Sequence, residues 1–207
     1  MKTFVYVDGF NLYYGALKST PYKWLNIRRM CELHLPKDEI IGIKYFTARI
    51  ISRPDDPQKH IRQQVYLRAI KTLSNTAIIY GHYSEHPKRM RLTSSLPDGT
   101  KFVEVIKTEE KGSDVNLAVN LLHDGYQNKY ELAVLVTNDS DLLSAIQIVQ
   151  TDLGLKVGIL NPQKHPSKVL KNEALFIRNL RKGIIKASQF SPSLSDANGS
   201  FYKPGDW

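Results

Sequence analysis

Short apolar segments alternate with amphipathic segments along most of the chain. Residues 3–7, 132–137 and 155–160 are runs of β-branched, aromatic and aliphatic residues, which predict buried strands. Between such runs, apolar residues recur every three or four positions, which is typical of a helix with one buried face. Strands that alternate with helices favour β-α-β units. The pattern therefore predicts an α/β fold with a mostly parallel central sheet.

The remaining elements follow from turn and cap residues. Further strands are expected at 40–51, 77–83 and 102–107. Helices are expected to begin near Phe10, at Asn26, at Asp55-Asp56-Pro57, at Ser113 and at Asp139, where cap, acidic or proline residues suit the first turn. The helix from Ser113 is expected to bury Val115, Ala118, Val119, Leu121 and Leu122. Residues 166–186 predict a short helix and an edge strand, and the polar, basic segment 84–101 predicts a loop or an exposed hairpin.

Residues 188–207 differ from the rest of the chain. They are rich in Ser, Gly and Pro and lack apolar periodicity, which is typical of a flexible tail. The aromatic residues in this segment can nevertheless dock on a surface, and we expect them to rest on the domain or on a neighbouring copy. The predicted organisation is one domain over residues 1–187 followed by a tail over 188–207.

The composition is that of a globular protein, with 42% hydrophobic and 24% charged residues among 207. The apolar runs are much shorter than a membrane span, and Asp8 interrupts the first run too early for a signal peptide. The single cysteine, Cys31, excludes an internal disulfide and a multi-cysteine metal site. We therefore expect a cytoplasmic protein without membrane contact, for which a homodimer is a common state.

The charge balance favours a polyanionic partner. Lys and Arg number 29 against 20 Asp and Glu, which gives a formal charge of +9. Nucleic acid is the usual partner of such a chain, although a solvated basic surface produces the same balance. The densest basic cluster lies within 86–91 and contains Lys88, Arg89 and Arg91. These three residues are expected to contact backbone phosphates.

Acidic side chains follow three of the expected strands. Asp8 ends the first strand, Asp114 opens the helix after 102–107, and Asp139 and Asp141 open the helix after 132–137. Any one of them could simply cap a helix. However, the carboxyl ends of parallel strands meet at one edge of a sheet, so these carboxylates are expected to gather. Grouped carboxylates repel one another and require a cation, and their hard oxygen atoms favour Mg²⁺ or Mn²⁺.

Three motifs carry a resemblance to a known family. They are VDGFNLYYG, EEKGSDVNLAVNLL and LVTNDSDLLSAI, and in this order they resemble the NYN domain of the PIN-like nuclease superfamily over roughly residues 1–160. The resemblance implies a Rossmann-like, three-layer α/β sandwich with a Mg²⁺-dependent ribonuclease site. It assigns Asp8 and Asn11 to the first motif, Asp114 to the second, and Asp139 and Asp141 to the third. The third motif departs from the family at Thr137-Asn138, where many relatives have Ser and Gly.

The chemistry that these residues allow is in-line hydrolysis of a phosphodiester bond. Asp8, Asp114 and Asp139 are the expected main metal ligands, and Asp141 completes the shell or orients the attacking water. Asn11 is expected to contact a phosphate oxygen or a metal-held water.

Additional residues are candidates for contact with the substrate. Lys111 is expected to hold a phosphate, with an ordinary solvated lysine as the alternative. Tyr13, Tyr14 and Tyr83 could stack on bases, although aromatic residues in such a domain more often belong to the core.

Several other functions are disfavoured. The chain lacks the glycine-rich motifs of P-loop NTPases and dinucleotide-binding folds and the GxSxG motif of serine hydrolases. A phosphatase with an aspartyl nucleophile requires a second acid two residues after Asp8, where Phe10 stands. The predicted function is therefore a metal-dependent nuclease, of the endoribonuclease type, that acts on RNA. DNA stays open as a substrate because phosphate contacts do not distinguish the sugars, and a non-catalytic RNA-binding or scaffold module is the alternative.

Overall fold

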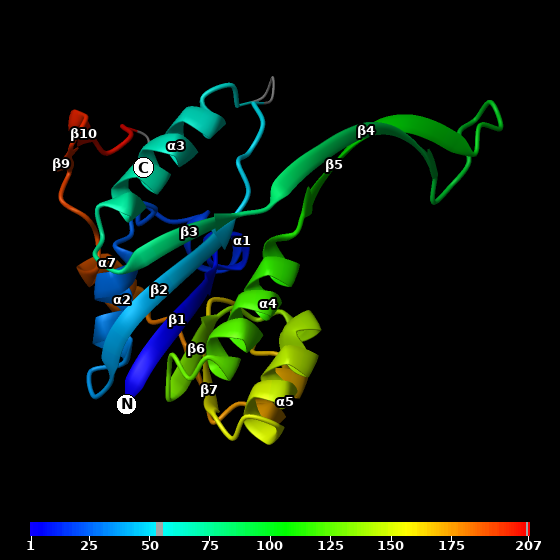
Figure 1. The fold of residues 1–207 in the computed structure, drawn as a ribbon. Coiled ribbons are helices and arrows are strands. Elements are labelled where there is room, and N and C mark those ends of the chain that lie inside the picture. The colour runs from blue at the N-terminus through cyan, green and yellow to red at the C-terminus, as the bar shows by residue number, and fades with distance from the viewer. Residues whose placement is uncertain (53–55, 206) are drawn as a thin grey trace.

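A computed structural model describes residues 1–52, 56–205 and 207. In this part of the chain, six strands form a central sheet in the order β3-β2-β1-β6-β7-β8 (Figure 1). Their bounds are β1 Lys2–Asp8, β2 Glu39–Thr47, β3 Thr76–Tyr80, β6 Leu132–Val136, β7 Lys156–Asn161 and β8 Phe176–Asn179. Every neighbouring pair is parallel. The predicted α/β fold with a parallel central sheet is confirmed.

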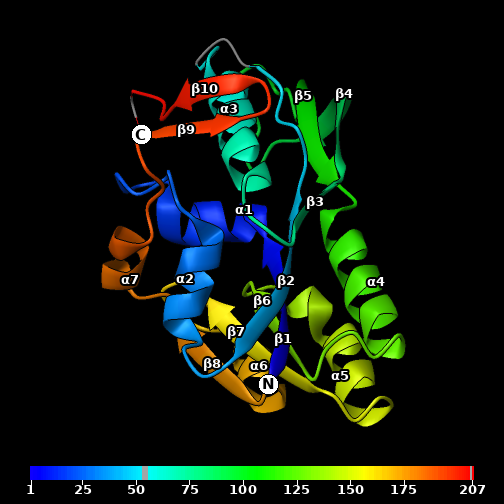
Figure 2. The same cartoon turned by 60° about the vertical axis from the view of Figure 1, so that its left-hand side comes forward.

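Helices cover both faces of the sheet and complete a three-layer sandwich (Figures 1 and 2). One layer contains α1 (Gly9–Leu12), the π-helical η1 (Tyr13–Leu17), α2 (Ile27–His34), α3 (Lys59–Lys71) and α7 (Lys182–Ala187). The other contains α4 (Ser113–Tyr126), the 3₁₀-helical η2 (Ser140–Leu142), α5 (Leu143–Thr151) and α6 (Lys168–Glu173). In the described residues, no helix combines the length and the apolar character needed to cross a membrane.

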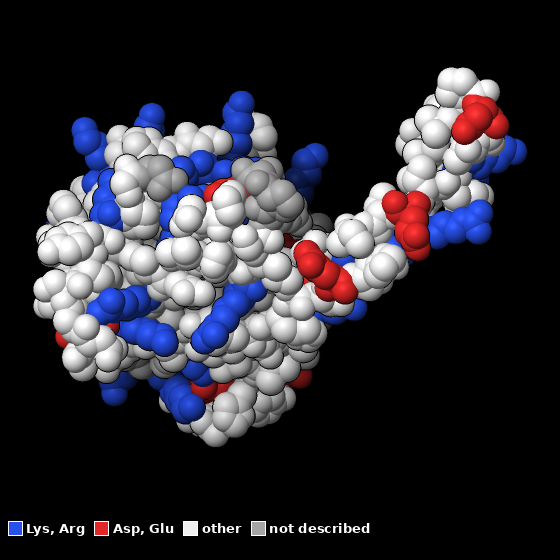
Figure 3. Space-filling model, turned by 90° about the horizontal axis from the view of Figure 1, so that it is seen from above, with Lys and Arg blue, Asp and Glu red and all other residues white. Residues whose placement is uncertain are grey.

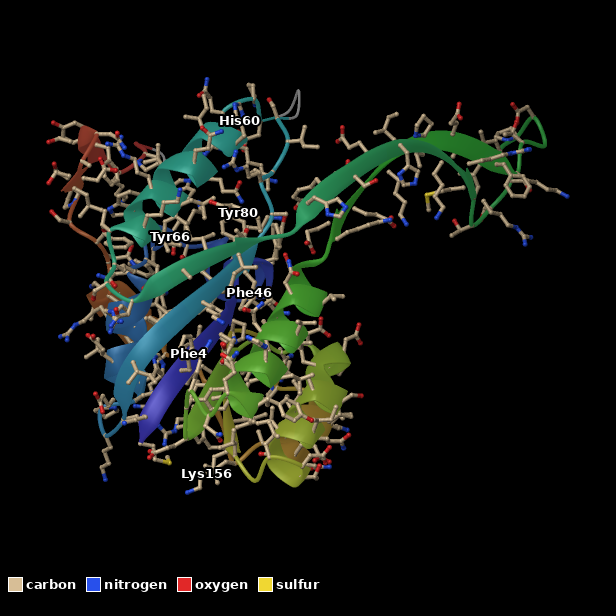
Figure 4. The ribbon with its side chains drawn as sticks, in the orientation of Figure 1. Phe4, Phe46, His60, Tyr66, Tyr80 and Lys156 are labelled. Atoms are coloured by element: carbon tan, nitrogen blue, oxygen red, sulfur yellow. The ribbon has the colours of Figure 1, made fainter. Side chains whose placement is uncertain are left out.

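The two central strands, β1 and β6, contribute side chains to both hydrophobic cores. Because successive side chains of a strand point to opposite faces, Val5 and Val7 of β1 pack with the α1–α3 layer. Tyr6 packs with Phe46 against α4 on the other face. Every residue of β6 is buried, which explains why its sequence is continuously apolar. Phe46 of β2 and Tyr66 of α3, both labelled in Figure 4, belong to the cores on opposite faces of the sheet.

The order of strands reverses beside β1. From β1 the sheet grows through β2 and β3 on one side and through β6, β7 and β8 on the other. In α/β sheets, ligands bind at the carboxyl ends of the strands on either side of such a reversal. Asp8 is the last residue of β1, and Thr137 directly follows β6. The first and third acidic motifs therefore lie at the position where this class of fold forms its sites.

An antiparallel hairpin projects from the body, and we call it the arm (Figure 1). It consists of β4 (His82–Arg91) and β5 (Phe102–Lys111), and every residue of both strands is at least partly exposed. The sequence predicted a loop or an exposed hairpin at 84–101 and a strand that ends at Lys107. The hairpin extends further toward the body at both ends, because Gly81 separates β3 from β4 and β5 continues to Lys111.

Several helix boundaries and faces differ from the predictions. Ser113 is the first residue of α4 rather than its cap, because Gly112 precedes it with a φ of 93°. Val115 and Val119 are 65% and 56% exposed, so their predicted burial is wrong. The predicted burial of Leu121 is confirmed, and the buried side of α4 also includes Leu117, one helical turn earlier.

Other boundaries shift for local reasons. The predicted helix from Phe10 is split into α1 and η1, and the helix from Asp139 begins with the 3₁₀ turn η2. The expected helix start at Asp55 lies outside the described residues, and α3 begins at Lys59.

The C-terminal segment is a packed hairpin rather than a tail without regular structure. It consists of β9 (Ser193–Asp196) and β10 (Gly199–Tyr202), and Phe190 and Phe201 join the core on the α3 side. The guanidinium of Arg68 donates two hydrogen bonds to the Asp196 carboxylate at 2.6 and 2.7 Å. Phe190, Phe201 and Trp207 thus dock on the domain, as expected, whereas Tyr202 is 68% exposed. The domain boundary at Ala187 stays a prediction.

Candidate active site

Three of the four predicted acidic residues, Asp8, Asp114 and Asp139, meet in a hollow at the carboxyl edge of the sheet. The hollow has a volume of about 380 Å³ and carries four carboxylates, those of Asp8, Glu110, Asp114 and Asp139. We call it the acidic hollow. Its remaining walls come from α1, η1 and the base of the arm, through Phe10, Asn11, Tyr14, Tyr83 and Thr108.

Asp8 is fixed by the corner between β1 and α1. Its Oδ1 accepts a hydrogen bond of 2.9 Å from the backbone N–H of Asn11 and so caps α1. The corner requires Gly9, because a Cβ there would lie 2.7 Å from the Tyr45 ring and from the Phe46 carbonyl oxygen. The Asp-Gly pair is therefore a strand-to-helix corner rather than a hairpin turn.

Thr137 links the first motif to the third. Its hydroxyl donates to Asp8 Oδ2 at 3.1 Å and accepts from the backbone N–H of Asp139 at 3.1 Å. Asp139 Oδ1 in turn accepts from the backbone N–H of Asp141 at 3.0 Å. Sequence reasoning treated Thr137 only as a departure from the family pattern, but the structure gives it a position between two carboxylates.

Glu110 was missed by sequence reasoning. It lies on β5 two residues after Thr108, so both side chains point to the same face of the arm, and it pairs across the strands with Tyr83. Glu110 Oε1 accepts from the backbone N–H of Ser113 at 3.0 Å, which ties the base of the arm to the start of α4. The sequence signal that could have indicated Glu110 is its spacing of two residues from Thr108, which places both side chains on the same face of a strand.

Burial and neighbouring negative charges raise the pKa values of Asp8 and Asp114. Burial raises the pKa of Asp8 to about 6, and the negative charges of Asp114 and Asp139 add to this, against hydrogen bonds from Asn11 and Thr137. The pKa of Asp114 is also raised, first by partial desolvation and then by Asp139, Glu110 and Asp141. Among the lining residues that the structure describes, none is Lys, Arg or His, so the charge of the hollow is left without a cationic side chain.

The donors suit a hard cation that keeps part of its water shell. Within residues 1–52, 56–205 and 207, no three His, Cys, Asp or Glu side chains are grouped closely enough to hold a metal ion by themselves. Mg²⁺ usually binds through only one or two carboxylates and retains several waters. The raised pKa values of Asp8 and Asp114 and the purely oxygen donor set therefore fit Mg²⁺ or Mn²⁺.

The sequence matches the profile of the NYN domain over residues 2–180. This chain belongs to the NYN domain family. The family is nuclease-like and lies within the PIN-like superfamily, as the three motifs indicated. The acidic hollow is therefore at the expected position in a nuclease-like fold.

Two further proteins are similar to this NYN domain protein. One is the 6-hydroxy-3-succinoylpyridine 3-monooxygenase HspA of Pseudomonas putida, which is 26% identical over 235 residues and is matched over 100% of this chain and 75% of its own length. The other is a protein of unknown function from Vibrio parahaemolyticus, known from a crystal structure. It aligns with a TM-score of 0.56 at 15% identity, over 87% of this chain and 93% of that one. This second similarity concerns the fold alone.

Of the other predicted site residues of the NYN domain, one lines the hollow and two lie outside its lining. Asn11 lines it, and its side-chain oxygen accepts from the Gln163 amide at 3.4 Å. Asp141 is exposed and lies outside the lining, although its charge acts on Asp114. Lys111 also lies outside the lining, and its ammonium is 3.9 Å from the Glu109 carboxylate. The catalytic and binding roles of these residues stay predictions.

The predicted basic cluster lies on the arm. Lys88, Arg89 and Arg91 are on β4, in a strand rather than a loop, and none of them lines the acidic hollow. The Arg89 guanidinium lies 4.8 Å from the centre of the Phe102 ring, in cation–π geometry. Seen from above, the arm carries side chains of both charges, and Lys and Arg are scattered over the body (Figure 3).

Two other cavities adjoin the acidic hollow. A polar depression of about 460 Å³ shares Asn11 and Asp139 with it and includes Lys164 and His165. A second cavity of about 270 Å³ lies between η1, β2 and α3 and shares Phe10 and Tyr14 with the hollow. We call this second cavity the aromatic pocket, because Tyr13, Tyr45, Tyr66 and Trp207 also line it.

Proposed function

We propose that this protein is a Mg²⁺- or Mn²⁺-dependent ribonuclease that hydrolyses phosphodiester bonds. The observation that carries the proposal is the acidic hollow, where carboxylates from three separate segments meet without a cationic side chain among the described lining residues. Such a hollow repels a phosphodiester until a divalent cation neutralises it. The nuclease-like character of the NYN family supports the same reaction class.

The residues in and beside the hollow have different tasks in this proposal. Asp8, Asp114 and Asp139 hold the cation directly or through water. The hydroxyl of Thr137 fixes the position of the Asp139 backbone relative to the Asp8 carboxylate through its two hydrogen bonds. A bound divalent cation supplies a water of lowered pKa and neutralises charge on the scissile phosphate. Asn11 donates its amide hydrogen to a phosphate oxygen, and Asp141 orients water at the rim.

RNA is the substrate class that the surroundings favour. The whole chain has a formal net charge of +9, and because the described lining of the hollow has acids but no Lys or Arg, the excess positive charge lies on other surfaces, where it attracts a polyanion. Tyr14 and Tyr83 border the carboxylates, and Tyr14 is 51% exposed, so unpaired bases have rings on which to stack. Phosphate contacts and base stacking do not distinguish ribose from deoxyribose, and DNA is therefore a second substrate to test.

A cleavage assay tests the proposal. The full chain is incubated with end-labelled single-stranded RNA, or DNA of the same sequence, in Mg²⁺ and in EDTA. We expect cleavage of RNA at internal positions in Mg²⁺ and none in EDTA. Asp139→Asn should abolish it, whereas Asp152→Asn, an exposed acid at the far end of α5, should not. RNA binding without metal-dependent cleavage of any substrate would instead support the non-catalytic module.

A second candidate function follows from the Pseudomonas putida relative, which is named as a monooxygenase. The aromatic pocket favours this candidate, because its rings suit a flat heteroaromatic substrate. A monooxygenase inserts one oxygen atom of O₂ and reduces the other to water with two electrons from a donor. Oxygen consumption by the protein with 6-hydroxy-3-succinoylpyridine and a reduced nicotinamide or flavin donor tests this candidate. Cleavage of RNA without such consumption rejects it.

A further inference from the structure

The aromatic pocket combines rings with positive charge. Of its described lining residues, six are aromatic and four are Lys or Arg, against one carboxylate. That carboxylate, Asp56, forms an ion pair with Arg62 at the edge of the pocket. The cations that remain are Lys18, Lys23 and Lys59. A ligand that suits both features is a flat ring that bears an anionic group.

The rings form walls from separate elements. Tyr45 on β2 and Tyr66 on α3 meet edge to face with ring centres 6.4 Å apart. Trp207 packs on Tyr66 at 5.7 Å, so the end of the C-terminal segment forms one wall. Tyr13 on η1 faces the same space and is only half-buried. Stacking on such rings is tolerant of base identity, because every base presents a π-face.

The pocket adjoins the acidic hollow. Phe10 and Tyr14 line both cavities, and Gly9 separates Asp8 from the pocket. The two sites also interact electrostatically, since the charge of Asp8 adds to burial in raising the pKa of Tyr45. A chain whose phosphate lies at the carboxylates therefore reaches the pocket with its neighbouring residue.

We propose that the aromatic pocket binds one nucleotide of a single-stranded RNA, adjacent to the scissile phosphate. The base lies among Tyr13, Tyr45 and Trp207, and the phosphate of that nucleotide lies against Lys18, Lys23 and Lys59. The choice of RNA as the parent molecule rests on the proposed function, whereas the ring-plus-anion chemistry rests on the pocket itself.

The size of the pocket restricts the form of the substrate. Its volume of about 270 Å³ is just below the usual range of small-molecule sites, about 300–1,000 Å³, which leaves room for one nucleotide at most and not for a base pair. A base within a duplex has to be flipped out to enter, at a cost in unpairing and unstacking. The pocket therefore selects single-stranded RNA over duplex RNA.

Binding of a mononucleotide tests the pocket independently of cleavage. Adenosine 5′-monophosphate is titrated into the full chain in EDTA, by calorimetry, beside adenosine and nicotinate. We expect the monophosphate to bind about tenfold more tightly than adenosine, because the lysines contact only the phosphate. Nicotinate, a small aromatic acid, should bind more weakly than the monophosphate. Tighter binding of nicotinate, or no binding of the monophosphate, would overturn the proposal.

Matched variants locate the binding. Lys59→Gln removes a charge at the pocket, and Tyr13→Leu removes a half-buried ring while leaving an apolar side chain. Each should weaken monophosphate binding about tenfold. Lys37→Gln, at an exposed lysine two residues before the start of β2, is the control and should leave binding unchanged. Equal losses in Lys59→Gln and Lys37→Gln, with no loss in Tyr13→Leu, would show that the monophosphate binds by general charge attraction and would reject the pocket.

Cleavage kinetics separate this proposal from the proposed function. If the protein cleaves RNA, Lys59→Gln and Tyr13→Leu should raise KM for single-stranded RNA and change kcat by less than about threefold. A loss confined to kcat would contradict the nucleotide site. If the wild-type protein cleaves no RNA but binds the monophosphate with the expected losses in the variants, the proposed function fails and the pocket stands.

Discussion

The acidic hollow and the aromatic pocket share two side chains, Phe10 and Tyr14, but are built on opposite principles. The hollow gathers carboxylates at the ends of β1 and β5 and just after β6, where the order of strands reverses. The pocket gathers rings and lysines from η1, β2, α3 and the C-terminal end. The carboxylates, which repel a phosphate group, thus line one cavity, and the lysines, which attract it, line the adjoining one.

The contrast also explains how each cavity depends on the rest of the molecule. Parallel strands that end at one edge of the sheet bring Asp8 and Asp139 together, whereas Glu110 and Asp114 reach the hollow from the base of the antiparallel arm and the start of α4. The pocket instead requires Trp207, which is held in place only after the C-terminal hairpin packs on α3. Substitutions at the two places should therefore have separable effects.

The largest effect is expected from Asp139→Asn. Asn caps a helix turn about as well as Asp, so the free energy of unfolding in EDTA should change little. Cleavage in Mg²⁺ should fall by about a hundredfold or more. The bound cation stabilises the charge of the transition state by several kcal/mol, and the substitution removes one of its ligands. Initial rates on labelled RNA measure this. Activity within about twofold of wild type would remove Asp139 from the site.

Trp207→Ala should affect the pocket and leave the hollow intact. Loss of one stacking ring is expected to weaken binding of adenosine 5′-monophosphate about tenfold. The rise in melting temperature on addition of Mg²⁺ should match that of wild type, because the carboxylates do not contact Trp207. Calorimetry and thermal melts give the two readouts. A reduced response to Mg²⁺ would mean that the two cavities are not separable in this way.

Asp8→Asn should stabilise the protein above pH 6. In EDTA, the pKa of Asp8 in the folded protein is about 6, above the ordinary value of 3.8. The folded protein therefore holds this proton more tightly than the unfolded chain, so stability falls as the pH rises between these values. The substitution removes the penalty, which is about 1–3 kcal/mol, and should raise the melting temperature by a few degrees near pH 8. The gain should vanish near pH 4, and a gain that persists there would have a different cause.

The smallest effect is expected from the arm. Replacement of Lys88, Arg89 and Arg91 by Ala should weaken RNA binding without changing the chemical step, because these residues lie away from the hollow. The slope of log K against log salt should become shallower by about 0.7 for each lost phosphate contact. Binding measured from low to moderate salt tests this. An unchanged slope would mean that the cluster is solvated and does not contact RNA.

The sequence predicted the sheet and most of the hollow because both follow from local rules. Apolar runs mark β1 and β6, and an acid after each strand must lie at the carboxyl edge once the strands are parallel. Glu110 and Thr137 were missed, since their roles depend on hydrogen bonds to Ser113 and Asp8 that the chain order does not reveal.

The aromatic pocket and the C-terminal hairpin were not predictable in the same way. Phe190 and Phe201 lie in a segment whose composition is typical of disorder, yet both are less than 8% exposed. Their burial depends on a surface left open by α2 and α3, which no periodicity within 188–207 encodes. Long-range packing of this kind becomes visible only when the partner surface is known.

The position of Trp207 has a practical consequence for recombinant protein. A purification tag fused after this residue starts at the wall of the aromatic pocket, where it competes with a ligand for the entrance. A tag before Met1 begins at the opposite edge of the sheet, at the amino end of β1 (Figure 1). It disturbs only the exposed ion pair between the terminal amine and Asp38, which contributes little to stability. Binding assays should therefore use an amino-terminal tag, and the same assay with a carboxyl-terminal tag reports whether the entrance is in use.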